Sequence, residues 1–129
     1  MARGSVGEQE LALLRHIADR GGATVGEVAE AFGAARGLAR STVLTMMERL
    51  RRKGQLSRRL LDGVYQYRAR ASSADLLKDA VQRFVERSLG GSVSPFVAYL
   101  SDATRVSEAD LRELEDVVSR LNAVRKKER

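Results

Sequence analysis

The sequence contains no cysteine and only one histidine, and these absences restrict its chemistry. Without cysteine the chain cannot form disulfide bonds, a thiolate metal site or a cysteine nucleophile. The single histidine, His16, argues against a histidine-rich metal site or a conventional catalytic triad, and we interpret it as a half-exposed helix residue. No Gly-rich phosphate loop is present either. We therefore expect no enzyme, no cofactor and no bound metal.

Aromatic residues are also scarce, at 5% of a chain of 129 residues in which hydrophobic residues make up 43%. A core must then consist of Leu, Val, Ala and Met, which favours helices over a large sheet. No apolar run approaches the roughly 20 residues that span a bilayer, and residues 1–5 lack the apolar stretch of a signal peptide. We expect a soluble, cytoplasmic protein.

The positive charge is confined to one half of the chain. Residues 1–70 contain 13 Lys/Arg and 7 Asp/Glu, whereas residues 71–129 contain 10 of each. Within the first half, residues 36–70 carry 10 basic residues and only two acidic ones, Glu48 and Asp62. This asymmetry indicates a nucleic-acid-binding module joined to a second, neutral module. The alternative is a basic surface that only confers solubility.

Helical periodicity and turn residues predict three helices in the basic half. The first covers residues 8–20 and ends at Gly21-Gly22. Thr24 and Glu27 form a capping box that opens a second helix ending near Phe32, with Gly33 as a left-handed cap and residues 33–37 as a loop. The third helix covers residues 39–53, ends at Gly54 and has an apolar face of Val43, Met46, Met47 and Leu50.

Two strand-like runs, residues 55–61 and 64–68, flank Asp62-Gly63, a pair typical of a two-residue β-hairpin turn. Three short helices followed by a basic hairpin predict a winged helix-turn-helix. The predicted fold class is therefore mainly α, with a winged helix-turn-helix and a small β-hairpin wing in residues 1–71. A helical dimerisation domain is predicted in residues 72–124, followed by a frayed basic tail in residues 125–129.

In a winged helix-turn-helix the third helix enters the major groove of double-stranded DNA, and its first polar residues meet the base edges. Basic residues near its end and on the wing are placed for backbone phosphates. Packing of the two tyrosines on the sheet, and a solvated helix end at residues 51–53, remain alternatives. The candidate DNA-binding residues are Arg40, Ser41, Thr42, Thr45, Arg49, Arg52, Lys53, Arg58, Tyr65 and Tyr67.

The second half is purely helical in pattern, with Ser94-Pro95 and Ser107–Asp110 as predicted helix starts. Its apolar stripes are too wide for three short helices to bury alone, so we expect two chains to bury them together as a homodimer. The alternative is a compact monomer. The candidate dimerisation residues are Leu77, Val81, Phe84, Phe96, Leu100, Leu111, Leu114, Val118 and Leu121.

The run Ser41-Thr42-Val43-Leu44-Thr45-Met46-Met47-Glu48-Arg49-Leu50-Arg51-Arg52-Lys53-Gly54 resembles the recognition-helix signature of the BlaI/MecI/CopY penicillinase-repressor family. Glu8–Leu11, Val64–Tyr67, Gly90–Ser92 and Ser107–Leu111 are similar to further segments of that family. The resemblance implies a homodimeric repressor of a resistance or stress operon that binds a palindromic operator. Carried over by position, it implies that the DNA-binding residues of the recognition helix are Arg40, Ser41, Thr42, Leu44 and Thr45. It also implies a membrane sensor-protease as a partner and release by cleavage within the dimerisation domain.

Four features depart from the family pattern. Ala39 replaces the expected Ser cap, and Leu44 stands where some members have a longer polar or aromatic residue. Ala98-Tyr99 stands where the family has a scissile Asn-Phe pair, so these two residues are only candidate cleavage positions. The missing cysteines exclude copper sensing by a cysteine cluster. A second hypothesis is a winged-helix interaction module that binds an acidic protein partner.

Overall fold

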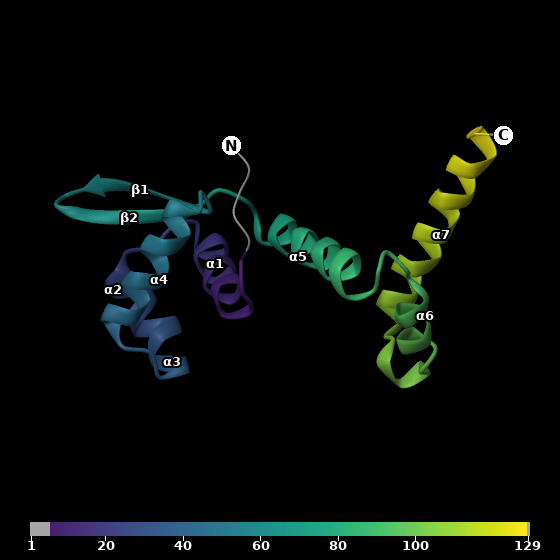
Figure 1. Cartoon of the computed structure of the whole chain (residues 1–129), viewed down its shortest axis with the longest axis horizontal. Helices are drawn as coiled ribbons and strands as arrows, with labels where there is room; N and C mark the ends of the chain where they lie inside the picture. Colours follow the sequence, from purple (N-terminus) through teal and green to yellow (C-terminus); the bar gives the residue numbers. More distant parts are fainter. Residues whose placement is uncertain (1–5, 129) are drawn as a thin grey trace. The chain divides into compact units, whose positions relative to one another are not determined.

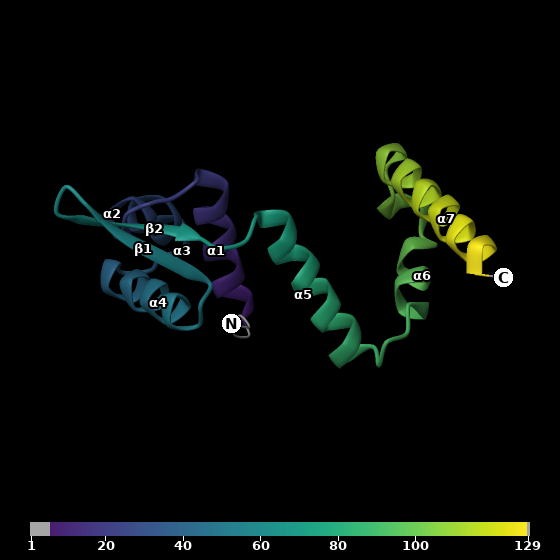
Figure 2. The same cartoon turned by 90° about the horizontal axis from the view of Figure 1, so that it is seen from above.

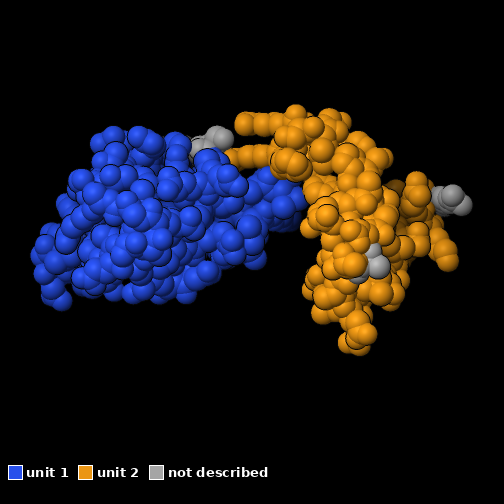
Figure 3. Space-filling view, turned by 90° about the horizontal axis from the view of Figure 1, so that it is seen from below, with its two compact units in different colours: residues 1–82 blue, residues 83–129 orange. Residues whose placement is uncertain are grey.

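The computed structural model describes residues 6–128, apart from the side chain of Ala103. The predicted mainly α fold with one hairpin is confirmed. The chain divides into two compact units, residues 1–82 and 83–129 (Figure 3). This division falls later than the domain border that we placed after residue 71. Residues 1–5 and 129, which include the start expected to lack a signal peptide and the end of the tail, lie outside the described residues.

Helix α1 (Glu8–Arg20) has the predicted bounds and ends at Gly21, whose φ of 73° is left-handed. Its buried residues are Leu13, Leu14 and Ile17. The predicted capping box is also present, at the start of α2 (Val25–Val28). The Glu27 amide donates to the Thr24 hydroxyl at 3.1 Å, and the Thr24 amide donates to the Glu27 carboxylate at 3.0 Å.

The predicted end of this second helix was wrong. The helix continues from α2 through a π-helical segment, η1 (Ala29–Gly33), into α3 (Ala34–Arg36). Gly33 has a right-handed φ of −63°, and the left-handed cap is Gly37, with φ 67°. A Cβ atom at Gly33 would lie 3.1 Å from the Val43 side chain and 3.2 Å from the Leu38 carbonyl oxygen, so a larger residue would require these neighbours to shift by a few tenths of an ångström.

Helix α4 (Arg40–Arg52) lies within one residue of its predicted bounds at each end. Val43, Met46, Met47 and Leu50 are all buried, as the apolar periodicity predicted. Ala39 precedes the helix and supplies no side-chain cap, so the first turn of α4 keeps its uncapped amide donors.

Strands β1 (Leu56–Leu61) and β2 (Val64–Ala69) form the predicted antiparallel hairpin, which extends beyond the helices (Figures 1 and 2). Both turn residues have positive φ, 52° at Asp62 and 79° at Gly63, as a type I′ turn requires. At the base of the hairpin Ala23 pairs with Tyr67 through two backbone hydrogen bonds of 2.8 and 2.9 Å. This bridge ties the hairpin to the segment between α1 and α2.

Helix α5 (Ser73–Ser88) begins within the first unit. Leu76 is buried in the same core as α1 and α4, and Arg15 on α1 donates to the Ser73 hydroxyl at 3.1 Å. The first turns of α5 thus complete the winged helix-turn-helix, which explains why the compact unit ends later than residue 71.

The second unit contains α6 (Ser94–Leu100), the 3-10 turn η2 (Ala103–Arg105) and α7 (Glu108–Glu128). Ser94 is the first residue of α6 and not its cap, because the capping position belongs to Val93. The Ser107 hydroxyl accepts from the Asp110 amide at the start of α7, as expected. Residues 125–128, predicted to fray, continue α7. Within residues 6–128 no helix is both long and apolar enough to span a bilayer.

Candidate nucleic-acid interface

The exposed face of α4 carries polar side chains opposite its buried apolar face. Arg40, Ser41, Thr42, Thr45, Arg49 and Arg52 are all exposed, and Leu44 keeps 43% of its surface accessible. The Thr45 hydroxyl donates to the Ser41 carbonyl at 3.0 Å, which orients the threonine and leaves its oxygen lone pairs as acceptors. This face therefore offers donors, acceptors and one apolar contact along the first two turns of a helix.

A groove of about 540 Å³ runs beside this face. Its other wall is the start of α1, from Gly7 to Glu10.

Because the first turn of α4 has no side-chain cap, its amides present partial positive charge. Such amides are suited to a DNA phosphate, since helix starts bind anions through their free N–H groups.

The two wing tyrosines, which lie on one face of β2, have different environments. Tyr65 is 42% exposed, and the Arg58 guanidinium stacks over its ring at 4.0 Å. Tyr67 is only 1% exposed and belongs to the core of the first unit. The packing alternative therefore describes Tyr67, whose buried ring is not available for direct contact with DNA. Tyr65 keeps an exposed edge.

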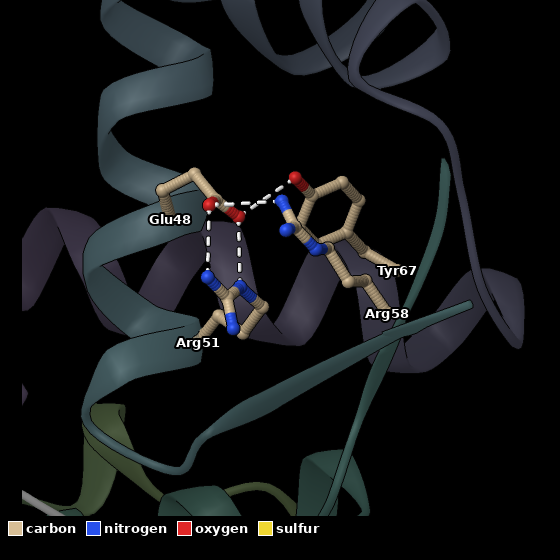
Figure 4. A network of polar contacts seen from close by, with 4 residues as sticks. All are labelled: Glu48, Arg51, Arg58 and Tyr67. Carbon is tan, nitrogen blue, oxygen red and sulfur yellow. Dashed lines mark hydrogen bonds and ion pairs between the residues drawn. The ribbon is translucent and has the colours of Figure 1, made fainter. Parts of the chain in front are cut away.

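The Tyr67 hydroxyl belongs to a polar network centred on Glu48 of α4 (Figure 4). Arg51 donates to both carboxylate oxygens, at 3.0 and 3.1 Å. Arg58 donates to Oε1 at 3.0 Å, and Tyr67 donates to Oε2 at 2.8 Å. Hydrogen bonding from Arg51 is the largest cause that holds the pKa of Glu48 at about 2, and Tyr67 and Arg58 add to it. Burial raises the pKa of Tyr67, so its hydroxyl remains a proton donor.

A second ion pair lies at the end of α4. The Lys53 ammonium donates to the Glu10 carboxylate of α1 at 3.0 Å, and both side chains are partly buried. Lys53 and Arg58, both predicted as DNA contacts, are thus engaged by carboxylates, whereas Arg49 and Arg52 are exposed.

Glu48 is not among the site residues predicted from the sequence. The sequence feature that points to its contacts is its position three residues before Arg51, a spacing that allows an ion pair on one helix. The partners Arg58 and Tyr67 come from the hairpin and are brought to Glu48 only by the fold.

His16 lies beside Phe32, with ring centroids 5.7 Å apart. Burial is the main cause that lowers the pKa of His16, so the neutral imidazole is favoured. Among the residues that the structure describes, no group of His, Asp and Glu side chains is arranged to hold a metal ion.

Three solved structures resemble this chain in fold. The YusO protein of Bacillus subtilis has a TM-score of 0.52 and 19% identity, over 92% of this chain and 75% of that one. The transcriptional regulator Tm0710 of Thermotoga maritima has a TM-score of 0.51 and 18% identity, over 96% and 79%. A MarR family protein of Bacillus stearothermophilus has a TM-score of 0.50 and 18% identity, over 95% and 77%. At these identities the likeness shows a shared fold.

A search of curated proteins finds no match to this chain. The family model described as penicillinase repressor, in contrast, matches residues 6–120. This match covers both the winged helix-turn-helix and most of the helical second unit. The chain therefore belongs to the penicillinase repressor (BlaI/MecI/CopY) family and is a DNA-binding transcriptional regulator.

Proposed function

We propose that this chain is a homodimeric, sequence-specific repressor that binds a palindromic operator of a resistance or stress operon. The observation that carries the proposal is the exposed polar face of α4, opposite a buried apolar face. An α-helix with short side chains at its start can approach the floor of the major groove closely. The repressor role and the class of regulated operon rest on membership of the family.

The residues of this interface differ in side-chain length, and therefore in the part of the DNA that each is suited to contact. Ser41, Thr42 and Thr45 are short and exposed near the start of α4, which suits them to base edges. Arg40 reaches a guanine edge or a phosphate, and Leu44 suits the methyl group of thymine. Arg49, Arg52 and the wing arginine Arg59 are exposed cations suited to phosphates.

The proposed homodimer is supported by the apolar surface of the second unit. No residue of α6 or α7 whose side chain the structure describes is buried. Val118 and Leu121 on α7 are 56% and 59% exposed, and Phe84 on α5 is 51% exposed. Apolar surface of this extent is typical of an interface that buries it against another chain. Two copies joined there would present two α4 helices to two half-sites.

Release by a membrane sensor-protease remains a proposal taken from the family. The candidate positions Ala98 and Tyr99 lie inside α6, and the Arg105 guanidinium stacks over the Tyr99 ring at 4.9 Å. A protease would need α6 to open locally before it could reach this bond. Limited proteolysis of the free protein would show whether α6 opens there.

The decisive experiment is selection of genomic fragments by the purified protein. We expect a shared palindrome, bound with an affinity that falls steeply as salt rises. The double variant Thr42→Ala/Thr45→Ala should lose preference for the palindrome and keep general DNA affinity. Arg87→Ala, which removes an exposed arginine from α5, is the matched control and should change neither.

Sequence-independent retention of DNA would contradict the proposal. Binding to an acidic protein that survives loss of Thr42 and Thr45 would instead support the interaction-module hypothesis. Both results differ from the expected one, in which the protein binds a defined palindrome in preference to nonspecific DNA.

A further inference from the structure

We propose that Glu48 is a positioning residue that fixes the wing to the recognition helix α4, and that Arg58 acts through Glu48 and is not a phosphate ligand. This inference rests on the proposed function, because it concerns how the same two elements are presented to the operator. It assigns a role to an acidic residue in the middle of the basic stretch.

The geometry joins three elements at one carboxylate. Glu48 lies on α4, Arg58 on β1 and Tyr67 on β2, and all three meet at the carboxylate in Figure 4. Arg58 and Tyr67 are directly opposite each other in the hairpin register. The Glu48 side chain therefore contacts both strands of the hairpin at one pair of opposed residues. Arg51 completes the arrangement by fixing the carboxylate on its own helix.

The wing needs such a fixed point. A two-stranded hairpin has little stability of its own. Besides the Glu48 contacts, this hairpin is joined to the core near its base, by the Ala23–Tyr67 bridge, the 3.2 Å hydrogen bond from Arg68 to the Gly21 carbonyl, and the buried side chains of Leu56 and Tyr67. Beyond Arg58 the side chains of Leu60, Leu61 and Val64 are 47–60% exposed. The Glu48 contacts and the Ala23 bridge therefore both hold the strands at the level of Tyr67, and the outer wing extends from there.

The electrostatics favour a fixed Arg58 over one that moves to DNA. The Glu48 side chain is only 18% exposed, and its charge is balanced by Arg51 and Arg58. Glu48 has one negative charge and two guanidinium partners; if Arg58 moved to a phosphate, the carboxylate would keep Arg51 but lose a charge-assisted hydrogen bond at a partly buried site. The stacking of Arg58 on Tyr65 at 4.0 Å holds the guanidinium from a second side. The low pKa of Glu48, about 2, keeps the network charged at neutral pH.

The test is a double-mutant cycle on the intact protein with its selected palindrome. Glu48→Gln and Arg58→Gln should each weaken operator binding by roughly 10-fold, the size expected for a lost charge-assisted hydrogen bond that positions an element. The double variant should bind no more weakly than either single variant, because both act through one contact. The slope of log Kd against log salt should be unchanged in Arg58→Gln, whereas loss of a phosphate ligand would lower it by about 1.

Arg59→Gln is the matched control, because Arg59 is the next residue of β1, is exposed and lies on the opposite face of the strand. Its effect should add to that of Glu48→Gln. Tyr67→Phe supplies a second test that leaves every charge in place, and it should weaken binding in the same direction. Amide hydrogen exchange in β1 and β2 should accelerate in Glu48→Gln and Tyr67→Phe.

Tighter operator binding by Glu48→Gln would overturn the inference, since it would show that the carboxylate only withholds Arg58 from DNA. Additive effects of Glu48→Gln and Arg58→Gln, or a lower salt slope in Arg58→Gln, would overturn it as well. If Glu48→Gln fails to fold, Tyr67→Phe decides, and unchanged binding by that variant counts against the inference. Failure of the unmodified protein to select a palindrome would contradict the proposed function itself.

Discussion

Gly33 lies against Val43, so that a Cβ atom built on Gly33 would be 3.1 Å from Val43 Cγ2. The same Cβ would be 3.2 Å from the Leu38 carbonyl oxygen. Val43 is fully buried on the inner face of α4, and Leu38 is held by a 2.8 Å hydrogen bond from its amide to the Gly33 carbonyl. The close approach of Gly33 therefore helps to set how near α4 lies to the preceding helix.

Gly33→Ala is expected to destabilise the protein by about 1–3 kcal/mol, because the added methyl group would push against Val43 Cγ2 and the Leu38 carbonyl oxygen and force both to shift. The measurement is thermal or urea unfolding. Gly26→Ala is the matched control, since Gly26 is also helical and its Cβ would meet only the end of the flexible Arg40 side chain, at 3.5 Å. That control should be neutral or stabilising by up to about 1 kcal/mol, from better helix propensity. Equal losses in both variants would contradict the packing argument.

Thr24→Ala should lower the free energy of unfolding by about 1 kcal/mol, because it removes the hydroxyl that accepts from the Glu27 amide. Thr24→Ser keeps a hydroxyl at the same position and should retain most of the stability. Urea unfolding of the two variants compares them directly. A loss of the same size in both would show that the methyl group of Thr24, and not its hydroxyl, is what matters.

His16 should make stability depend on pH. Burial lowers the pKa of His16 in the folded state below its ordinary value of 6.5, so the unfolded chain binds the proton more readily. The contribution of the neutral imidazole is complete above about pH 6.5 and declines as the pH falls through the unfolded pKa. His16→Gln should reduce the pH dependence of the free energy of unfolding between pH 7 and pH 5. An unchanged slope in that variant would assign the pH dependence to other groups.

Leu44 should read a thymine methyl group if α4 lies in the major groove as proposed. Replacement of each operator thymine by deoxyuridine removes only that methyl, and at one position it should weaken binding a few-fold, on the order of 1 kcal/mol. Leu44→Ala should abolish sensitivity to the same replacement. The affinities of the variant and the unmodified protein for both DNAs give the interaction free energy between Leu44 and the methyl group. Equal sensitivity of the two proteins at every thymine would rule out this contact.

Leu121→Glu should convert the proposed dimer to a monomer, because it places a charge within the exposed apolar surface of α7. Sedimentation equilibrium measures the change, and operator affinity should fall with it. Ala123→Glu is the control, since helical spacing places Ala123 away from the stripe of Leu114, Val118 and Leu121. A monomeric unmodified protein, or dissociation by both variants alike, would contradict a dimer built on this stripe.

Local patterns were sufficient for most elements of the winged helix-turn-helix. The capping box at Thr24 and Glu27, the apolar face of α4 and the Asp62-Gly63 turn depend on neighbours within a few residues, so their signals are complete in the sequence. The asymmetry of charge and the α4 motif likewise indicate a DNA-binding regulator from the sequence alone. The repressor role, the operator and the dimer remain predictions.

What the sequence determined by itself is therefore helix α4, its exposed polar face and the hairpin wing. Only the tertiary structure decided that Gly33 belongs inside a helix, since the reason lies in Leu38 and Val43 packed against it. The fold likewise buried Tyr67, although Tyr65 on the same face of the strand remains exposed. It also brought Arg58 and Tyr67 to Glu48 from residues 10 and 19 positions away. Contacts between separate elements depend on how those elements pack, and short-range sequence patterns carry no record of that packing.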